Sequence, residues 1–139
     1  MGTIIRPEVS EKNPYWIERH RYYELKHFCL QYPIWKKTYE AMNGLLGRPA
    51  DLVTFGKMKH VSNPTERVAI MKSYYSKRMD MIQDASEKAN SDLAEYILKG
   101  VTEGLSYDVL KIKMDIPCCK DVYYESYRRF FWILNKMRD

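Results

Sequence analysis

The chain has 139 residues, of which 45% are hydrophobic and 14% aromatic, and its formal net charge is +5. This apolar content excludes a largely disordered chain, and the absence of any run of about 18 apolar residues excludes a membrane-spanning helix. The three cysteines, two of them adjacent, give no disulfide framework, so a cytoplasmic location is expected.

The low content of chain-breaking residues favours helices. Only 6 glycines and 6 prolines occur, too few for a many-turned β fold, and we predict an all-α fold. Residues 1–14 are expected to form a mobile arm. Between residues 19 and 42, apolar side chains recur at steps of three and four, which indicates one face of a helix. Pro33 predicts a kink or break near Tyr32, since proline removes a backbone donor; the continuous apolar stripe favours a kink.

Residues 43–63 contain three glycines and are expected to be a loop or linker. A long helix then begins, with Asn63 as the N-cap and Pro64 at the first helical position. Its buried side is expected to hold Val68, Met71, Tyr75, Met79, Ile82 and Ala89, widened by Ile70, Tyr74 and Met81. This helix would pair with the first helix or form the seam of a homodimer, and the intramolecular pairing is favoured. Residues 1–89 are thus expected to form an N-terminal helical region.

Residues 90–139 are predicted to form a separate helix-turn-helix domain. A helix capped by Asn90 or Ser91 is expected to end at Gly104, as helices often end on glycine. Ser106 would cap a short helix, and the sequence Asp-Ile-Pro after it predicts a corner. The last helix is expected to begin near Pro117 or Cys118. A short helix, a tight corner and a longer helix are the plan of a helix-turn-helix.

The stretch GLSYDVLKIKMDIP resembles the helix-turn-helix pattern of the promoter-reading C-terminal domain of sigma factors. The matching residues are Gly104, Leu105, Ser106, Tyr107, Leu110, Met114 and Ile116. The pattern usually has a small residue where Lys111 stands and often glycine where Asp115 stands. The whole chain is similar to small transcriptional regulators of the RinA/ArpU type, from phages and prophages of Gram-positive bacteria. That resemblance implies a DNA-binding activator in the cytoplasm of a bacterial host.

The start of the last helix is the candidate DNA contact, because this part of a helix-turn-helix reaches base edges and phosphates. Projection at about 100° per residue puts Phe131 on one side of the helix, and on the other side it puts Cys119, Val122, Ser126, Arg129, Phe130, Ile133 and Met137. The residues selected on the side of Phe131 are Lys120, Tyr124, Tyr127 and Arg128, with Lys111 and Lys113 holding the DNA backbone. The alternative is that the charged groups are ordinary surface residues and the tyrosines belong to the core. Further along, Phe131 and Trp132 are predicted to pack on the N-terminal helices or on a second subunit.

Residues that carry chemistry are scarce. No histidine pairs with Cys118 and Cys119 at zinc-finger spacing, Cys29 falls on an apolar face, and no glycine-rich phosphate loop occurs. Carboxylates form no pair suited to acid–base catalysis. We therefore expect no enzyme, no metal and no cofactor.

Two functional hypotheses follow. The first is a sequence-specific transcriptional regulator that binds duplex DNA, with N-terminal helices that supply a core, a dimer contact or a surface for RNA polymerase. The second is a phage-encoded inhibitor that binds a protein, such as a host defence factor or a polymerase component. The second fits the abundance of tyrosine and the thin positive charge, since Tyr, Trp and Arg favour protein interfaces.

Overall fold

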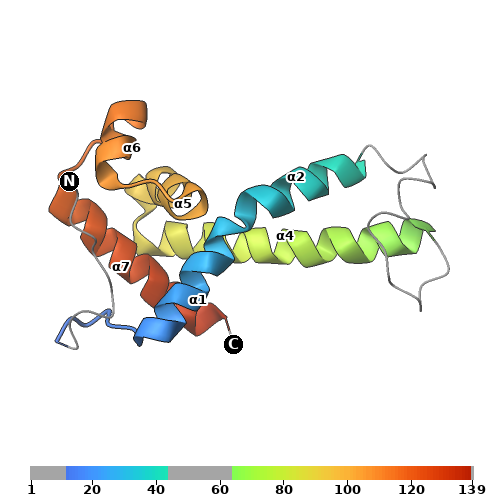
Figure 1. Ribbon diagram of the computed structural model, residues 1–139, viewed down its shortest axis with the longest axis horizontal. Helices are drawn as coiled ribbons and strands as arrows, with labels where there is room; N and C mark the ends of the chain where they lie inside the picture. Colours follow the sequence, from blue (N-terminus) through green and yellow to red (C-terminus); the bar gives the residue numbers. More distant parts are fainter. Residues whose placement is uncertain (1–11, 44–63, 139) are drawn as a thin grey trace. The chain divides into compact units, whose positions relative to one another are not determined.

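A computed structural model describes residues 12–43 and 64–138, and the regular structure within them is entirely helical (Figure 1). The all-α fold class is thereby confirmed for the described residues. The elements are α1 (Arg19–Leu30), α2 (Tyr32–Asn43), α4 (Pro64–Ala89), a 3-10 turn (Ser91–Leu93), α5 (Ala94–Glu103), α6 (Tyr107–Met114) and α7 (Lys120–Met137). None of the described helices combines the length and apolar content that crossing a membrane requires. The predicted loop at 43–63 and most of the predicted arm at 1–14 lie outside the described residues.

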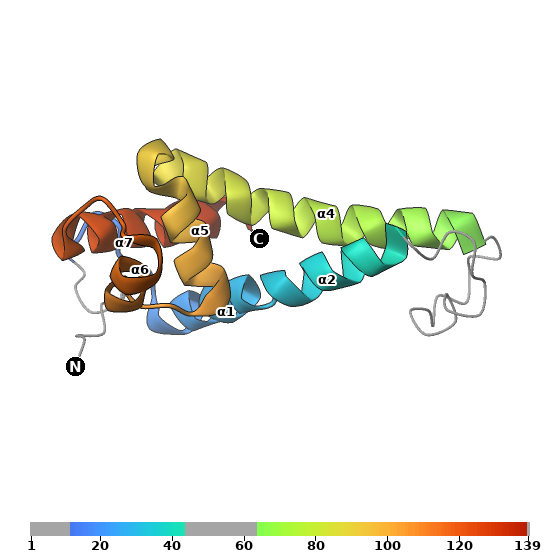
Figure 2. The same ribbon diagram turned by 90° about the horizontal axis from the view of Figure 1, so that it is seen from above.

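The chain divides into two compact units, and the division differs from the predicted boundary after residue 89. One unit joins residues 1–31 to residues 81–139, and the other consists of residues 32–80. The difference arises because α1 contacts both α5 and α7 (Figures 1 and 2). The first helix therefore supplies core residues to the C-terminal helices, which sequence periodicity cannot reveal.

The interruption predicted near Tyr32 is confirmed. Helix α1 ends at Leu30 and α2 begins at Tyr32, so that two helices replace one kinked helix. Pro33 is the second residue of α2, a position where its missing N–H costs no intrahelical hydrogen bond. Glu18 caps the start of α1, where its carboxylate accepts hydrogen bonds from the backbone of His20 and Arg21 at 2.9 and 3.2 Å.

The smaller unit contains α2 and the first part of α4. Met42 and Val68 are buried in it, and Met71 and Tyr75 pack against them. Helix α4 begins at Pro64, as its sequence predicts, and it runs for 26 residues. The expected buried side was drawn too wide, however, because Ile70 and Tyr74 are exposed.

In the larger unit, capping residues mark the start of the 3-10 turn before α5, the end of α5 and the start of α6. The side chain of Asn90 accepts a hydrogen bond from the backbone of Asp92, and Gly104 ends α5 in the left-handed conformation with φ 70°. Ser106 caps α6 by accepting a hydrogen bond from the N–H of Val109. These predicted ends are confirmed, because capping depends on neighbours in sequence alone.

Aromatic side chains fill the core of the larger unit. Tyr22 of α1 meets Phe131 of α7 edge-on, with ring centroids 5.2 Å apart. Trp132 lies 5.5 Å from the ring of Tyr15, before α1. The predicted packing on the N-terminal helices is confirmed for Phe131, whereas Trp132 contacts Tyr15, which precedes α1. Other buried members of this core are Leu25, Cys29, Ile82, Ile97, Leu110, Ile116, Tyr123, Phe130 and Leu134.

Candidate nucleic-acid interface

A tight corner joins α6 to α7. Asp115 ends α6 with φ 51° and ψ 52°, and its N–H donates to the carbonyl of Lys111 at 3.1 Å. This left-handed conformation is the one that glycine adopts most easily, and aspartate is among the few other residues that tolerate it. Ile116 follows and is fully buried, as expected for a residue that plugs the angle between two helices.

Helix α7 begins later than its sequence predicts. Cys119 is the N-cap and Lys120 is the first helical residue, whereas the expected start lay near Pro117 or Cys118. The corner therefore spans residues 115–119. Pro117 is a residue that commonly opens helices. Cys119, however, has an extended backbone with φ −79° and ψ 167°, so the helix begins only after it.

Two tyrosines fix the corner from inside. The hydroxyl of Tyr107 donates to the carbonyl of Cys118 at 2.5 Å, and the hydroxyl of Tyr124 accepts from the N–H of Tyr107 at 3.2 Å. Tyr124, predicted as a DNA contact, thus ties the start of α6 to α7. Any phosphate reaching its hydroxyl would have to compete with that intramolecular hydrogen bond.

The six predicted contact residues fall into two groups. Lys111, Tyr124 and Tyr127 have partners that hold the protein's own fold. The ammonium of Lys111 donates to the carbonyl of Ile116 at 3.3 Å and lies 3.3 Å from the carboxylate of Asp115. In the second group, Lys113 and Lys120 have no side-chain partner among the described residues, and Arg128 pairs with Glu125 of its own helix.

Tyr127 reaches towards α1 and not away from it. Its hydroxyl lies 2.7 Å from the hydroxyl of Tyr22, and its ring packs 4.9 Å from Phe131. Burial raises the pKa of Tyr127 well above its ordinary value, and the hydrogen bond with Tyr22 adds to the rise. The hydroxyl is therefore enclosed in the core.

The cations of the second group are more available. Lys113 is exposed and Lys120 is half-buried, and neither has a side-chain partner within the described part of the chain. Arg128 forms an ion pair of 3.1 Å with Glu125, one turn away, and its side chain is 22% exposed. The Glu125 side of this pair is 55% exposed, so solvent screens the pair and a phosphate can replace the carboxylate.

The outward side of α7 differs from the side that the helical projection predicts. Tyr123, Phe130, Phe131 and Leu134 are buried, whereas Val122 is 46% exposed and Arg129 is exposed. The helical projection did not identify Val122 and Arg129 as outward-facing residues. The recurrence of large apolar residues from Tyr123 to Phe130 and Leu134, at steps of seven and four, was the signal that could have placed the buried face.

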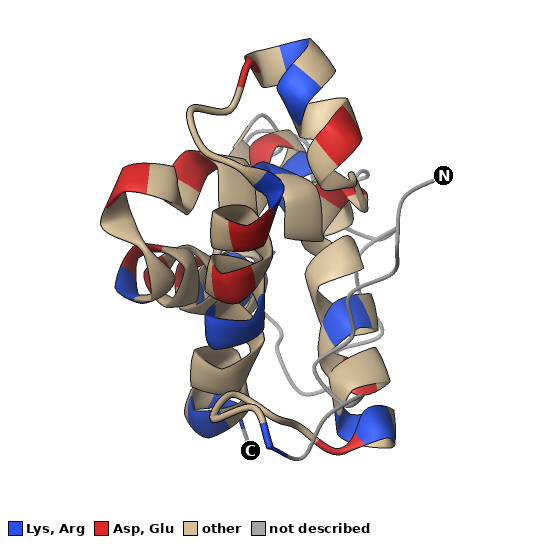
Figure 3. Cartoon of the chain, turned by 90° about the vertical axis from the view of Figure 1, so that its left-hand side faces the viewer, with Lys and Arg blue, Asp and Glu red and all other residues tan. Residues whose placement is uncertain are grey.

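Charges of both signs share the surface around the corner. On α7, Asp121 and Glu125 lie between Lys120 and the pair Arg128 and Arg129 along the chain, and Figure 3 shows red and blue bands on the same helices. On α6, Ile112 is 84% exposed between Lys111 and Lys113. The corner therefore offers separated cations, the carboxylates of Asp115, Asp121 and Glu125, and two exposed apolar side chains, and not a uniform positive field.

No group of three or more His, Cys, Asp and Glu residues suited to a metal ion occurs in the part of the chain that the structure describes. Comparisons of the chain with protein-family models, with curated proteins and with solved structures found no match.

Proposed function

We propose that this chain binds duplex DNA with the corner between α6 and α7. The observation that supports the proposal best is the local geometry. A short helix ends in a left-handed residue, an apolar plug fills the angle, and a longer helix leaves the corner with its first turns accessible. A helix-turn-helix presents its second helix to the major groove in this way.

Separate roles follow for the side chains at the corner. Lys113 and Lys120 would contact phosphates, because both ammonium groups lack partners within the described residues. Arg128 would join them by exchanging Glu125 for a phosphate. Lys111, Tyr124 and Tyr127 would act mainly by positioning the corner, since DNA would have to displace their present partners.

The biological role is proposed on the resemblance to phage regulators of the RinA/ArpU type. The chain would act as a transcriptional regulator encoded by a phage or prophage, in the cytoplasm of a bacterial host. RNA polymerase is the protein partner expected of such a regulator. A homodimer would require a repeated or palindromic DNA site, since dimers of this class bind two half-sites.

The test is the salt dependence of binding to duplex DNA by the full chain. A protein that contacts phosphates loses affinity as salt rises, with a log–log slope of about −0.9 for each contact. Replacement of Lys113 and Lys120 by glutamine should lower the slope by about 1.8. The control is Lys36→Gln with Lys37→Gln, which removes the same charge from exposed positions on α2. Equal slopes for the corner variant and the wild type would refute the proposal.

A second candidate function is the binding of a protein partner through the same corner. The observation that favours it is the exposure of Ile112 and Val122, because exposed apolar side chains suit the centre of a protein interface. Asp121 and Glu125 would also repel phosphates. Its test is capture of host RNA polymerase by the wild type and by the Ile112→Ser, Val122→Ser variant. Capture that the variant loses, together with no binding to duplex DNA, would support this candidate over the first.

A further inference from the structure

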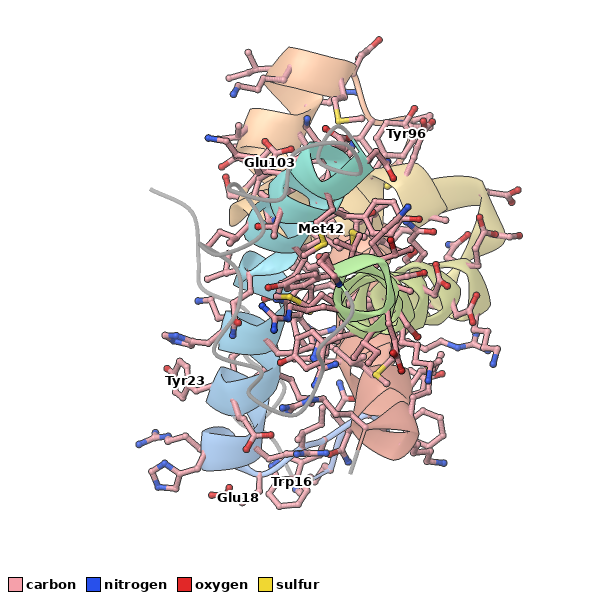
Figure 4. The ribbon with its side chains drawn as sticks, turned by 90° about the vertical axis from the view of Figure 1, so that its right-hand side faces the viewer. Trp16, Glu18, Tyr23, Met42, Tyr96 and Glu103 are labelled. Carbon is pink, nitrogen blue, oxygen red and sulfur yellow. The ribbon has the colours of Figure 1, made fainter. Side chains whose placement is uncertain are left out.

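The outer face of α1 carries cations that have no acidic side-chain partner among the described residues. Arg19, His20, Tyr23, Lys26 and His27 fall within about 120° of the helix circumference at about 100° per residue. Arg19, His20 and His27 are exposed, and Tyr23 and Lys26 are half-buried. Figure 4 shows Tyr23 on this outward side of α1.

The acidic residues of α1 and its N-cap are engaged elsewhere. The carboxylate of Glu18 accepts hydrogen bonds from the first backbone N–H groups of the helix. The carboxylate of Glu24 pairs with Arg21 at 2.6 Å and also with Arg138 at the end of the chain. Neither Arg19 nor Lys26 has a side-chain partner among the described residues, so their charges are available to an external anion.

We infer that this face of α1 is a second contact for the sugar-phosphate backbone of duplex DNA. The inference rests on the proposal that duplex DNA is the ligand of this chain. Arg19 and Lys26 are separated by about 10.5 Å along the helix axis. A DNA strand carries one phosphate per about 3.4 Å of its axis, so the two side chains can contact separate phosphates of one strand.

The composition of the face favours a nucleic acid over an acidic protein. Protein interfaces have an apolar centre, and the large exposed hydrophobic residues of the described chain are Ile34, Ile70, Tyr74, Ile112 and Val122. None of these lies on α1. A surface of cations without an apolar centre suits the phosphate backbone, which provides charge but no apolar surface. Such contacts carry no sequence information.

The experiment measures binding of the full chain to a random-sequence duplex across a salt series. For Arg19→Gln with Lys26→Gln, the log–log slope is expected to fall by about 1.8, the amount for two lost phosphate contacts. The control variant, Lys36→Gln with Lys37→Gln, has the same net charge and should keep the wild-type slope. Thermal unfolding of each variant checks that these surface changes leave the fold intact.

The outcomes separate this inference from the proposed function. A slope lost in the Lys113, Lys120 variant but kept in the α1 variant would overturn the inference and leave the corner as the DNA site. Loss in the α1 variant alone would support the inference and remove the case for the corner. Tighter binding to poly-L-glutamate than to duplex at equal salt would overturn it in favour of an acidic protein, and a wild-type chain that binds no duplex would overturn both proposals.

Discussion

The two halves of α7 have the same helical backbone but different surroundings. The C-terminal half packs on α1, where Phe131 meets Tyr22 and the guanidinium of Arg21 donates to the side chain of Asn135 at 2.6 Å. The N-terminal half leaves Val122 and the carboxylates of Asp121 and Glu125 accessible. One helix therefore contributes side chains to the core and, on the outward side of its N-terminal half, a surface that a ligand can reach.

The comparison also shows that residue type does not decide the role of a tyrosine. Tyr123, Tyr124 and Tyr127 all lie in the first three turns of α7, yet all three point towards the protein. Tyr123 is fully buried, and burial raises the pKa of its hydroxyl. Valine at 122, the more apolar residue, is the exposed one. Helical phase, set by the packing of α7 on its neighbours, outweighs polarity here.

The largest expected effect is a difference in the free energy of unfolding between variants in the two halves of α7. Phe131→Ala removes a buried ring from the contact with Tyr22 and Tyr127, which should lower the free energy of unfolding by about 3–5 kcal/mol. Val122→Ala, the matched change on the exposed half, should alter it by less than about 0.5 kcal/mol. Urea denaturation measures both. Similar losses in the two variants would show that the outward side of the N-terminal half, where Val122 lies, is also packed against protein.

A smaller effect is expected where α5 meets the buried tyrosine of α7. A Cβ atom added at Gly100 would lie 2.3 Å from the hydroxyl oxygen of Tyr123, a clash that must move a rigid buried ring. Gly100→Ala should therefore destabilise the fold by about 1–3 kcal/mol.

The Tyr123→Phe change should relieve that clash, because it removes the hydroxyl. That hydroxyl is buried without a hydrogen-bond partner among the described residues, so Tyr123→Phe alone should cost little or stabilise the protein. The double variant is expected to recover part of the loss caused by Gly100→Ala. Simple addition of the two single effects would contradict the close contact.

Alkaline pH should weaken the packing of α1 against α7. Burial raises the pKa of the Cys29 thiol above its ordinary value of 9.0 and that of Tyr127 above 10.0. Folding therefore favours both neutral forms, and their contribution is present below these ordinary values and is lost as pH rises towards the folded pKa.

The free energy of unfolding should consequently fall as the pH rises above about 9, as followed by urea denaturation at a series of pH values. The variant Cys29→Ala with Tyr127→Phe should lose less stability across the same range, although it is less stable at neutral pH. A wild-type stability that is constant up to pH values at which free tyrosine ionises would contradict the burial of both groups.

The smallest effect is expected at the exposed ion pair of Arg128 and Glu125. Because the side chains are 22% and 55% exposed, Arg128→Ala should change the free energy of unfolding by no more than about 1 kcal/mol. The same variant should weaken binding to duplex DNA if Arg128 contacts phosphate. A large loss of stability would instead show that the Arg128 side chain is packed against the rest of the protein.

Local signals in the sequence predicted the helices well and their assembly poorly. The all-α class, Pro64 at the start of α4, Gly104 at the end of α5 and the Ser106 cap depend on neighbouring residues, so they could be found from sequence alone. The pairing of α1 with α5 and α7 depends on contacts across about a hundred positions, and no periodicity encodes it.

The sequence predicts a candidate site at the start of the last helix, but the structure shows that the side chains there were assigned with the wrong helical phase. Cys119 delays the first turn of α7, and the aromatic core fixes which side faces inward. Lys113 and Lys120 remain candidate contacts, whereas Val122 and Arg129 were missed. The spacing of polar residues cannot show which side of a helix faces inward when tyrosines lie on both sides of it. For Tyr127, the contact with Tyr22 shows that the side chain faces inward.

The most direct test of the proposal that the corner binds DNA uses Cys119, which is exposed at the start of α7, while Cys29 is buried and protected from reagents. An iron chelate that cleaves DNA would be attached to Cys119 in a Cys118→Ser background, with Ser91→Cys, Cys119→Ser as the control beyond α4. We predict that the chelate on Cys119 cleaves a bound duplex at a localised position and that the control does not. Cleavage that is equal from both positions, or absent from Cys119 on a duplex that the protein binds, would contradict entry of the corner into DNA.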